Sequence, residues 1–555
     1  MKKTSVQVIA LVIFGVGLFL RLFLLRDQIP LNDDWHGLIY AATHSLSELL
    51  ESRSTFAHTS PLMNVYRWFL LHSVGWSELL LSAPSVFAGI LSLLIFPQCV
   101  RKAHGNKEAL IFSGLLALSP LLIFYSRIGR PYGPLVFCLF LSLYSGGFWV
   151  LTNQLKYLAL YICSSILAVY LHPVAVVTVF APLFAGGACV LLHRKSVRTP
   201  LLRICLVGGL LGLICFLLLR PATTMTGSVM VDNPLPDFAT WKQLALMFLG
   251  TSGALLAFGL LCVAACGALI LLRKSLFWGG MFLGVFVLNL LAIWIGRFAL
   301  VHAAIVLARY LIILCPIILF WVAIALSKLF SVSRIAGVIS CVGVFFLLAA
   351  TSPLWNTYRA PNNFTNHSAF QESYEPAPRH LPRRSKMFPK SANLQKTTLP
   401  DFYQRLPADA DCIIEYPMML GDLYNLNYFY QQHHRKRVVV GYTMDVPWEH
   451  DRTDGVYSRC LMNHVFCKIP FPSRLRFRSI VNIYNAEAVE KTGADYLVIH
   501  FNLLAELYND PVETKYGRTP ALKECLEKMV QCYGKPVYID RTMIVFALNQ
   551  EGEIQ

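Results

Sequence analysis

The chain has 555 residues, of which 56% are hydrophobic and 14% charged, and its mean hydropathy is +0.54, values that exclude an ordinary soluble globular protein. The net charge of +17 is unevenly placed: residues 1–352 carry 24 Lys and Arg against 9 Asp and Glu, whereas residues 353–555 carry 24 against 22. Because the excess positive charge accompanies the apolar part of the chain, it argues against a nucleic-acid-binding protein.

Residues 1–352 have the hydropathy pattern of an α-helical polytopic membrane domain. Apolar runs of about 17–25 residues, the length that a bilayer requires, recur through this region. The first run, Val6 to Leu25, is too long for a signal-peptide core, so it predicts an uncleaved anchor. About eleven spans are predicted, at residues 5–25, 77–97, 108–124, 134–151, 156–171, 174–192, 203–220, 244–271, 276–296, 304–326 and 335–352.

Short basic connectors predict the orientation of these spans. They lie at residues 101–107, near 156, and at 193–198, 273–274 and 328–334. Short loops rich in Lys and Arg stay on the cytoplasmic side. We therefore expect a multi-pass protein of the cell inner (plasma) membrane with a cytoplasmic N-terminus. The loop at 26–76 and everything after residue 352 then lie outside.

The C-terminal part has a soluble composition. Residues 353–400 are rich in Pro, Asn, Ser and basic residues and predict a linker, and residues 401–555 predict an extracytoplasmic α/β domain. The expected strands lie at 412–416, 437–442, 495–501, 535–540 and 542–548, with helices at 485–492 and 520–531.

Four cysteines of the C-terminal domain fall into two pairs with the same spacing. Cys460 with Cys467, and Cys525 with Cys532, each enclose six residues. An oxidising compartment would permit a disulfide in each pair. The alternative is that all of them stay reduced.

Two adjacent carboxylates, Asp33 and Asp34, follow the first span. Acids beside lipid are costly unless they meet a cation, a metal or a proton donor. A carboxylate placed there can act as a catalytic base, which suggests a membrane-embedded transferase. Asp33 with His36 or His58 could bind a divalent cation, or these histidines could be structural. No other cofactor is indicated, because the chain has no Gly-rich phosphate loop.

Arginines on the predicted outer side form a second group of candidates. Arg127 and Arg130, three residues apart in the run Tyr125 to Gly133, fit a bidentate grip on phosphate oxygens. Snorkelling to lipid headgroups is the alternative.

A later outer turn carries Arg297, His302 and Arg309. Arg309 lies inside an apolar span, where an unpaired charge costs a few kcal/mol, so it needs an anionic partner. That partner is either a substrate phosphate or a structural salt bridge. His172, before Pro173 at another outer corner, is either a hydrogen-bond donor to substrate or part of a kink.

Several short motifs, in this order and on one predicted side of the membrane, resemble the GT-C superfamily. They are the acid pair, His58-Thr59-Ser60-Pro61-Leu62, Ser119-Pro120, Tyr125-Ser126-Arg127, Arg130-Pro131-Tyr132, His172, and Arg309-Tyr310 with Pro316. More narrowly, residues 1–352 are similar to the protein mannosyltransferase and aminoarabinose transferase branch, which uses polyprenyl-phosphate-linked sugars.

The resemblance implies an inverting transfer of a sugar from a polyprenyl-phosphate donor to a lipid, glycan or protein acceptor at the outer face. It implies that Asp33 deprotonates the acceptor and that Asp34 supports it. The candidates for the donor phosphate are Arg127, Arg130, Tyr125 and Arg309. Those for other substrate contacts are His58, His172, Tyr132, Arg297 and His302.

Two departures from the family pattern leave questions open. The sequence reads Asn32-Asp33-Asp34 where many relatives have Asp-Glu, so either acid could be the base. Residues 125–133 hold no acid that would help to bind a metal, so metal dependence also stays open.

The sequence also argues against two other classes of function. A transporter or flippase would place ionisable groups at mid-span and often show an inverted repeat, and the sequence shows neither. An O-antigen ligase or polymerase would carry its key Arg and His in one large late outer loop, rather than beside an early pair of acids as here.

Overall fold

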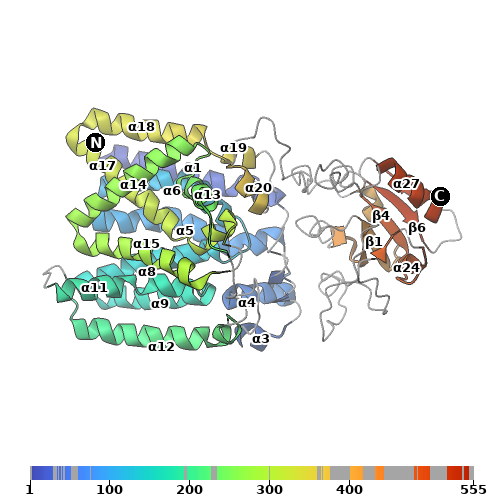
Figure 1. Cartoon of the computed structure of the whole chain (residues 1–555), viewed down its shortest axis with the longest axis horizontal. Coiled ribbons are helices and arrows are strands. Elements are labelled where there is room, and N and C mark those ends of the chain that lie inside the picture. Colours follow the sequence, from blue (N-terminus) through green and yellow to red (C-terminus); the bar gives the residue numbers. More distant parts are fainter. Residues whose placement is uncertain are drawn as a thin grey trace. The chain divides into compact units, whose positions relative to one another are not determined.

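The computed structural model describes residues 3–28, 34, 37–38, 40–41, 44–51, 60–75, 77–192, 197–226, 234–298, 301–358, 364, 367–374, 400–416, 430–431, 433–442, 481–483, 486–500, 522–540 and 543–548. The chain divides into two compact units (Figure 1). The helical unit comprises residues 1–26, 44–359 and 367–376, and the second unit comprises 27–43, 360–366 and 377–555.

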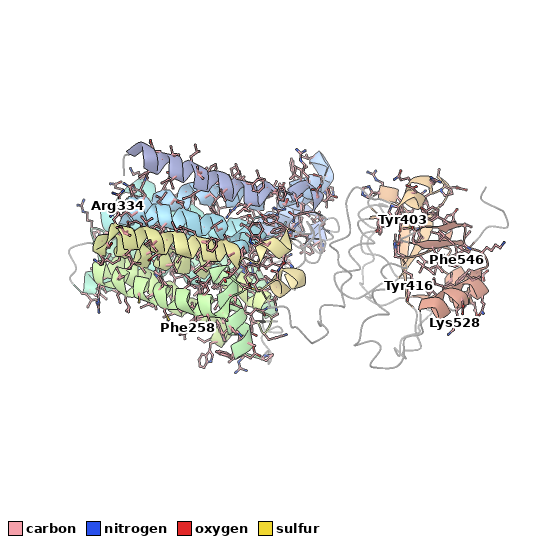
Figure 2. All side chains as sticks on the ribbon, turned by 90° about the horizontal axis from the view of Figure 1, so that it is seen from above. Phe258, Arg334, Tyr403, Tyr416, Lys528 and Phe546 are labelled. Atoms are coloured by element: carbon pink, nitrogen blue, oxygen red, sulfur yellow. The ribbon has the colours of Figure 1, made fainter. Side chains whose placement is uncertain are left out.

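The helical unit is a membrane domain. In the described part of the chain, eight helices are long and apolar enough to cross a membrane. They lie side by side in Figure 1 and are α1 (Lys3–Leu22), α5 (Glu78–His104), α8 (Tyr132–Thr152), α12 (Leu201–Thr226), α14 (Ala254–Lys274), α15 (Leu276–Gly296), α17 (Leu314–Val332) and α18 (Arg334–Ala350). Their outer surface is apolar, as at Phe258, which is 67% exposed (Figure 2). The predicted multi-pass membrane protein is confirmed.

Every predicted span is helical, but four of them are built from two helices. The shorter helices are α6 (Asn106–Leu118), α7 (Pro120–Tyr125), α9 (Leu155–Leu171), α10 (Ala175–Val179), α11 (Ala181–Leu191), α13 (Phe238–Leu249) and α16 (Ala304–Tyr310). The expected span 108–124 breaks at Ser119, whose ψ of 109° is non-helical because Pro120 follows. The expected single span 244–271 is interrupted after α13, where Gly250 caps the helix with a φ of +73°.

Close helix packing holds the bundle together where α14 crosses α17. A Cβ atom added at Gly267 would lie 1.9 Å from the carbonyl oxygen of Trp321. Only glycine allows this approach, as is usual for helices that pack tightly in membranes.

We predict that Gly267→Ala lowers the thermal stability of the protein in detergent. The added methyl group must push α14 and α17 apart, and such overpacking costs about 1–3 kcal/mol. Gly259→Ala in the same helix is the matched control, because no atom lies within 4 Å of its added Cβ. Equal melting temperatures for the two variants would contradict the close packing described above.

Short elements complete the helical unit. They are η1 (Leu25–Asp27), whose last residue falls in the second unit, α3 (Leu46–Glu51), α4 (Pro61–Phe69), the π-helical turn η2 (Leu70–Val74), α19 (Leu354–Thr357) and α20 (His367–Glu372). Residues of α20 pack against the bundle: Phe370 stacks on Phe124 at 4.2 Å, and Gln371 accepts a hydrogen bond from the Ile305 amide at 3.1 Å. The expected boundary at residue 352 is therefore too early, and residues 354–358 and 367–374 belong with the helices.

The second unit contains a six-stranded sheet in the order β3-β2-β1-β4-β6-β5. Strands β3, β2, β1 and β4 are parallel, and β6 and β5 are antiparallel additions. The strands are β1 (Cys412–Tyr416), β2 (Arg437–Tyr442), β3 (Val481–Asn482), β4 (Tyr496–Ile499), β5 (Tyr538–Ile539) and β6 (Ile544–Ala547). The predicted α/β domain is confirmed, although the two-residue strand β3 carries no pattern in the sequence that could reveal it.

Both faces of the sheet are covered, because alternate strand residues point to opposite sides. Ile413 and Val498 pack on one face in a cluster with residues of α21 (Asp401–Arg405). Ile414 and Leu497 pack on the other face in a cluster with residues of α24 (Ala486–Glu490) and α27 (Leu522–Tyr533).

Candidate functional site

The turn between α7 and α8, residues 126–131, carries the predicted arginines and is held by hydrogen bonds to its backbone. Ser85 of α5 donates to the carbonyl of Arg130 at 2.8 Å, and Arg67 of α4 donates to the carbonyl of Gly129 at 2.6 Å. A Cβ atom at Gly133 would lie 2.8 Å from the Tyr125 carbonyl oxygen. The turn is therefore closed tightly, and the start of α8 is fixed against the end of α7.

Four of the predicted site residues come together with Tyr310 in a group that we call the aromatic–arginine cluster: Tyr125, Tyr132, His172, Arg309 and Tyr310. The Arg309 guanidinium lies 6.0 Å from the centre of the Tyr132 ring and 5.7 Å from that of Tyr310. The His172 ring lies 5.9 Å from each of these two rings. Tyr125 packs edge-on to Tyr132 and donates its hydroxyl to the Ile305 carbonyl at 3.1 Å.

His172 is neutral in this cluster. Burial lowers the pKa of His172 to about 3, and the positive charges of Arg309 and Arg130 lower it further in the same direction. Its Nδ1 atom accepts a hydrogen bond from the Val174 amide at 3.2 Å. In a neutral imidazole whose Nδ1 is an acceptor, the proton is on Nε2.

The Arg127 side chain contacts the end of α1. Its Nη1 atom donates to the carbonyls of Leu20 at 3.2 Å, Arg21 at 3.4 Å and Phe23 at 2.7 Å, and its guanidinium lies 5.6 Å from the Tyr358 ring. These carbonyls are at the end of α1, where a helix leaves its last carbonyls without partners. The contacts favour a structural role for Arg127, in place of the phosphate grip expected from its spacing to Arg130.

Two buried arginines were not predicted. Arg67 and Arg21 are each 1% exposed. Arg67 also donates to the Asn64 side chain at 2.9 Å, and Arg21 donates to the carbonyls of Gly17 and Leu116. Arg67 lies in the amphipathic helix α4, and that pattern was a usable signal, whereas nothing in the sequence marks Arg21 apart from its place in an apolar run.

The remaining predicted residues lie elsewhere. Arg297 is exposed and ends α15 with a φ of +40°, and His302 is exposed, with its carbonyl bound by the Thr240 hydroxyl at 2.7 Å. Asp34 is buried and belongs to the second unit. The other predicted residues of the acidic loop, Asp33, His36 and His58, lie outside the described residues.

A divalent cation stays a prediction. Among the described residues, no group of three His, Cys, Asp or Glu side chains has a metal-binding arrangement.

No protein-family model matches the sequence, and no curated protein matches it. Among solved structures, the chain is similar to ArnT from Cupriavidus metallidurans in the apo state, with a TM-score of 0.50 and 12% identity over 98% of this chain and 97% of ArnT. ArnT bound to undecaprenyl phosphate gives the same TM-score and identity over 99% of this chain and 98% of ArnT. The archaeal oligosaccharyltransferase AglB from Archaeoglobus fulgidus, in complex with an inhibitory peptide and a dolichol-phosphate, matches with a TM-score of 0.42 and 11% identity over 91% of this chain and 71% of AglB.

The chain has the fold of ArnT over nearly its whole length. The match to ArnT includes both the membrane helices and the C-terminal sheet, since it extends over nearly the whole of each chain. The fold implied by the short motifs of residues 1–352 is therefore confirmed.

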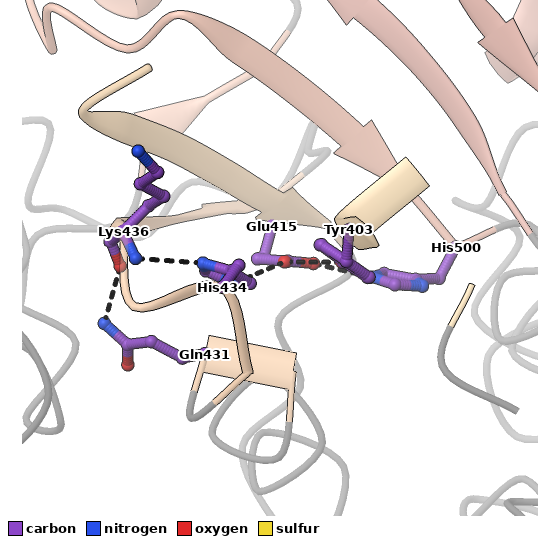
Figure 3. Close-up of polar contacts among 6 residues, drawn as sticks. All are labelled: Tyr403, Glu415, Gln431, His434, Lys436 and His500. Atoms are coloured by element: carbon purple, nitrogen blue, oxygen red, sulfur yellow. Dashed lines mark hydrogen bonds and ion pairs between the residues drawn. The ribbon is translucent and has the colours of Figure 1, made fainter. Parts of the chain in front are cut away.

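A second polar group lies in the C-terminal domain, around Glu415. The Tyr403 hydroxyl donates to Glu415 Oε1 at 2.6 Å, and His500 Nε2 lies 2.5 Å from Oε2 (Figure 3). His434 Nε2 is 4.0 Å from Oε1. All of these side chains are buried, and Tyr430 stacks on both Tyr403 and His500.

This Glu415 cluster lies where the strand order of the sheet reverses. Glu415 is near the carboxyl end of β1, and His500 directly follows the neighbouring parallel strand β4. Ligands of open α/β sheets bind at such points. Here the Glu415 and His500 side chains are at most 1% exposed and contact each other, which favours a role in holding the two strands together.

We predict that acid weakens the C-terminal domain through His434. Burial lowers the pKa of His434 to about 4, against an ordinary value of about 6.5. As the pH falls from 6.5 to 4, His434 therefore binds a proton in the unfolded chain but not in the folded domain. The free energy of unfolding then decreases by up to about 3 kcal/mol. Hydrogen exchange of the β1 and β4 amides in the full-length protein, corrected for the intrinsic pH dependence, measures this loss. His434→Gln should reduce its pH dependence, and an unchanged slope would contradict the assignment.

The two proposed disulfides have different outcomes. Cys460 and Cys467 lie outside the described residues. Cys525 and Cys532 both lie on α27, where seven residues advance the chain by about 10 Å. A disulfide requires Cα atoms about 4.4–6.8 Å apart, so this helix excludes the expected 525–532 bond.

Proposed function

We propose that this protein is an inverting glycosyltransferase that moves a sugar from a polyprenyl-phosphate-linked donor to an acceptor at the outer face of the membrane. The observation that carries the proposal is the aromatic–arginine cluster with Arg130 beside it. Two guanidinium groups next to a neutral histidine and tyrosine rings suit a phosphate that is joined to a sugar. Guanidinium groups bind phosphate oxygens, and aromatic faces pack well against partly apolar groups.

The reaction needs few groups because the donor is already activated. Asp33 takes the proton of the acceptor hydroxyl as that oxygen attacks the anomeric carbon, and the bond to the lipid phosphate breaks. Asp34 supports Asp33. Arg309 and Arg130 stabilise the negative charge that develops on the departing phosphate. A single displacement of this kind inverts the configuration at the anomeric carbon.

The likeness to ArnT supports the choice of donor class. ArnT has been solved with undecaprenyl phosphate, a polyprenyl phosphate, and this chain shares its fold over nearly the full length of both proteins.

The distribution of charge supports the proposed orientation. Along α9, Lys156 lies in the first turn and His172 directly follows the last. Lys102, at the end of α5, lies over the Phe148 ring near the end of α8, whereas Tyr132 begins α8. Lysines therefore lie at the end of these helices opposite to the cluster. Under the positive-inside rule that end is cytoplasmic and the cluster is outside.

We predict that Asp33→Asn abolishes sugar transfer and leaves binding of undecaprenyl phosphate intact. Loss of a general base typically lowers the rate by about 10²–10⁴-fold, while in the proposed site the phosphate is bound by arginines. Purified protein in nanodiscs, supplied with polyprenyl-phosphate-linked sugars, gives the rate, and the smaller loss expected for Asp34→Asn separates the base from the supporting acid. Near-normal turnover by Asp33→Asn would remove Asp33 as the base.

We also predict different defects for two arginines. Arg309→Ala should weaken binding of undecaprenyl phosphate by about 10- to 100-fold, because a hydrogen bond to a charged group is lost. Arg127→Ala should chiefly lower the melting temperature, because its bonds to the end of α1 are lost. Titration with the lipid phosphate and thermal unfolding of both variants separate the two effects. An unchanged affinity in Arg309→Ala would contradict the phosphate role of the cluster.

A further inference from the structure

His172 differs from the other polar members of the site because one of its two ring nitrogens is already committed. The Val174 amide donates to Nδ1 at 3.2 Å, two residues along the chain. This bond fixes which nitrogen carries the proton, so Nε2–H is a hydrogen-bond donor with a defined direction.

The ring itself is held in place. It lies 5.9 Å from Tyr132, at the start of α8, and 5.9 Å from Tyr310, at the end of α16. The residue is 7% exposed, so its side chain keeps a small accessible surface, and Nε2 is the ring nitrogen that the Val174 amide leaves uncommitted.

The charges around this donor match an anion. Arg309 and Arg130 both act on His172 electrostatically, and among the described residues the rings of Tyr132 and Tyr310 lie against its ring. A third positive charge would be expensive beside two guanidinium groups, whereas a neutral N–H adds a directed hydrogen bond without that repulsion.

We propose that His172 works in its neutral form and donates its Nε2 hydrogen to an oxygen of the substrate phosphate that Arg309 and Arg130 neutralise. This rests on the proposed function, because it assumes a polyprenyl phosphate in the cluster. His172 is then neither the base nor a charged ligand of the phosphate. It fixes the orientation of the phosphate that the arginines attract.

Two amide substitutions separate this role from a structural one. In His172→Gln the side-chain NH₂ can reach the position of Nε2, but the acceptor for Val174 is lost. In His172→Asn the side-chain oxygen can accept the Val174 N–H in place of Nδ1, but the donor at the Nε2 position is lost. His172→Gln thus keeps the proposed bond to the phosphate and loses the bond to Val174, and His172→Asn does the reverse.

The experiment measures binding of undecaprenyl phosphate to full-length protein in nanodiscs. We expect His172→Gln to stay within a few-fold of the natural protein and His172→Asn to lose about 10- to 100-fold in affinity. The reverse ranking would overturn the proposal, because it would mean that His172 serves only to bind the Val174 amide. Melting temperatures of both variants report on that structural bond separately.

The pH dependence provides a second readout. The ratio of the affinities of the natural protein and of His172→Gln cancels the titration of the lipid phosphate itself. A neutral His172 predicts a ratio that stays constant from pH 8 to pH 5.5. A ratio that rises as the pH falls through about 6.5 would mean that a charged imidazole binds the phosphate, and it would overturn the proposal.

A polyprenol without phosphate distinguishes the failure of this proposal from that of the proposed function. If the natural protein binds the phosphate and the polyprenol equally well, the donor class is wrong and the role of His172 falls with it. If the phosphate is preferred but His172→Asn matches the natural protein, only the role of His172 is wrong.

Discussion

Guanidinium groups that donate to backbone carbonyls hold the turn on which the site depends. Arg67 reaches from α4 to Gly129, and Arg127 reaches from the turn to the end of α1. Little water is present near lipid, so a carbonyl left without a donor costs several kcal/mol. These bonds join segments about 60 and 100 residues apart in the chain. They fix the backbone conformation of the turn that carries Arg130 and leads into Tyr132.

Arginine has two different roles around this turn. The Arg127 guanidinium uses its N–H edge for helix carbonyls, whereas that of Arg309 lies over the rings of Tyr132 and Tyr310. An aromatic ring engages the face of a guanidinium, while an anion engages its N–H edge. Stacking is thus compatible with phosphate binding, and capping of carbonyls competes with it. This is the physical reason why we propose Arg309, rather than Arg127, as a ligand of the phosphate.

Much of this architecture could be predicted from the sequence, because membrane spans and short buried strands leave strong hydropathy patterns. The sequence placed Tyr125, Tyr132, His172 and Arg309 on one predicted side of the membrane, but it placed Arg297 and His302 there too, and only tertiary packing separates the two sets. The separate role of Arg127 could not be predicted, because its spacing to Arg130 is the same whether its side chain turns toward a ligand or toward α1. The break at Gly250 and the close approach at Gly267 depend on tertiary packing, which hydropathy does not encode.

Two buried histidines, one in each unit, make the same local hydrogen bond in opposite electrostatic surroundings. His172 accepts the amide of Val174, and His434 accepts the amide of Lys436, so each ring keeps its proton on Nε2. In the C-terminal domain that Nε2 lies 4.0 Å from the Glu415 carboxyl group, beside a negative charge supplied by the fold. In the membrane domain it lies among the positive charges of Arg309 and Arg130. A donor surrounded by cations is complementary to an anion, and in the proposed reaction the substrate phosphate is that anion.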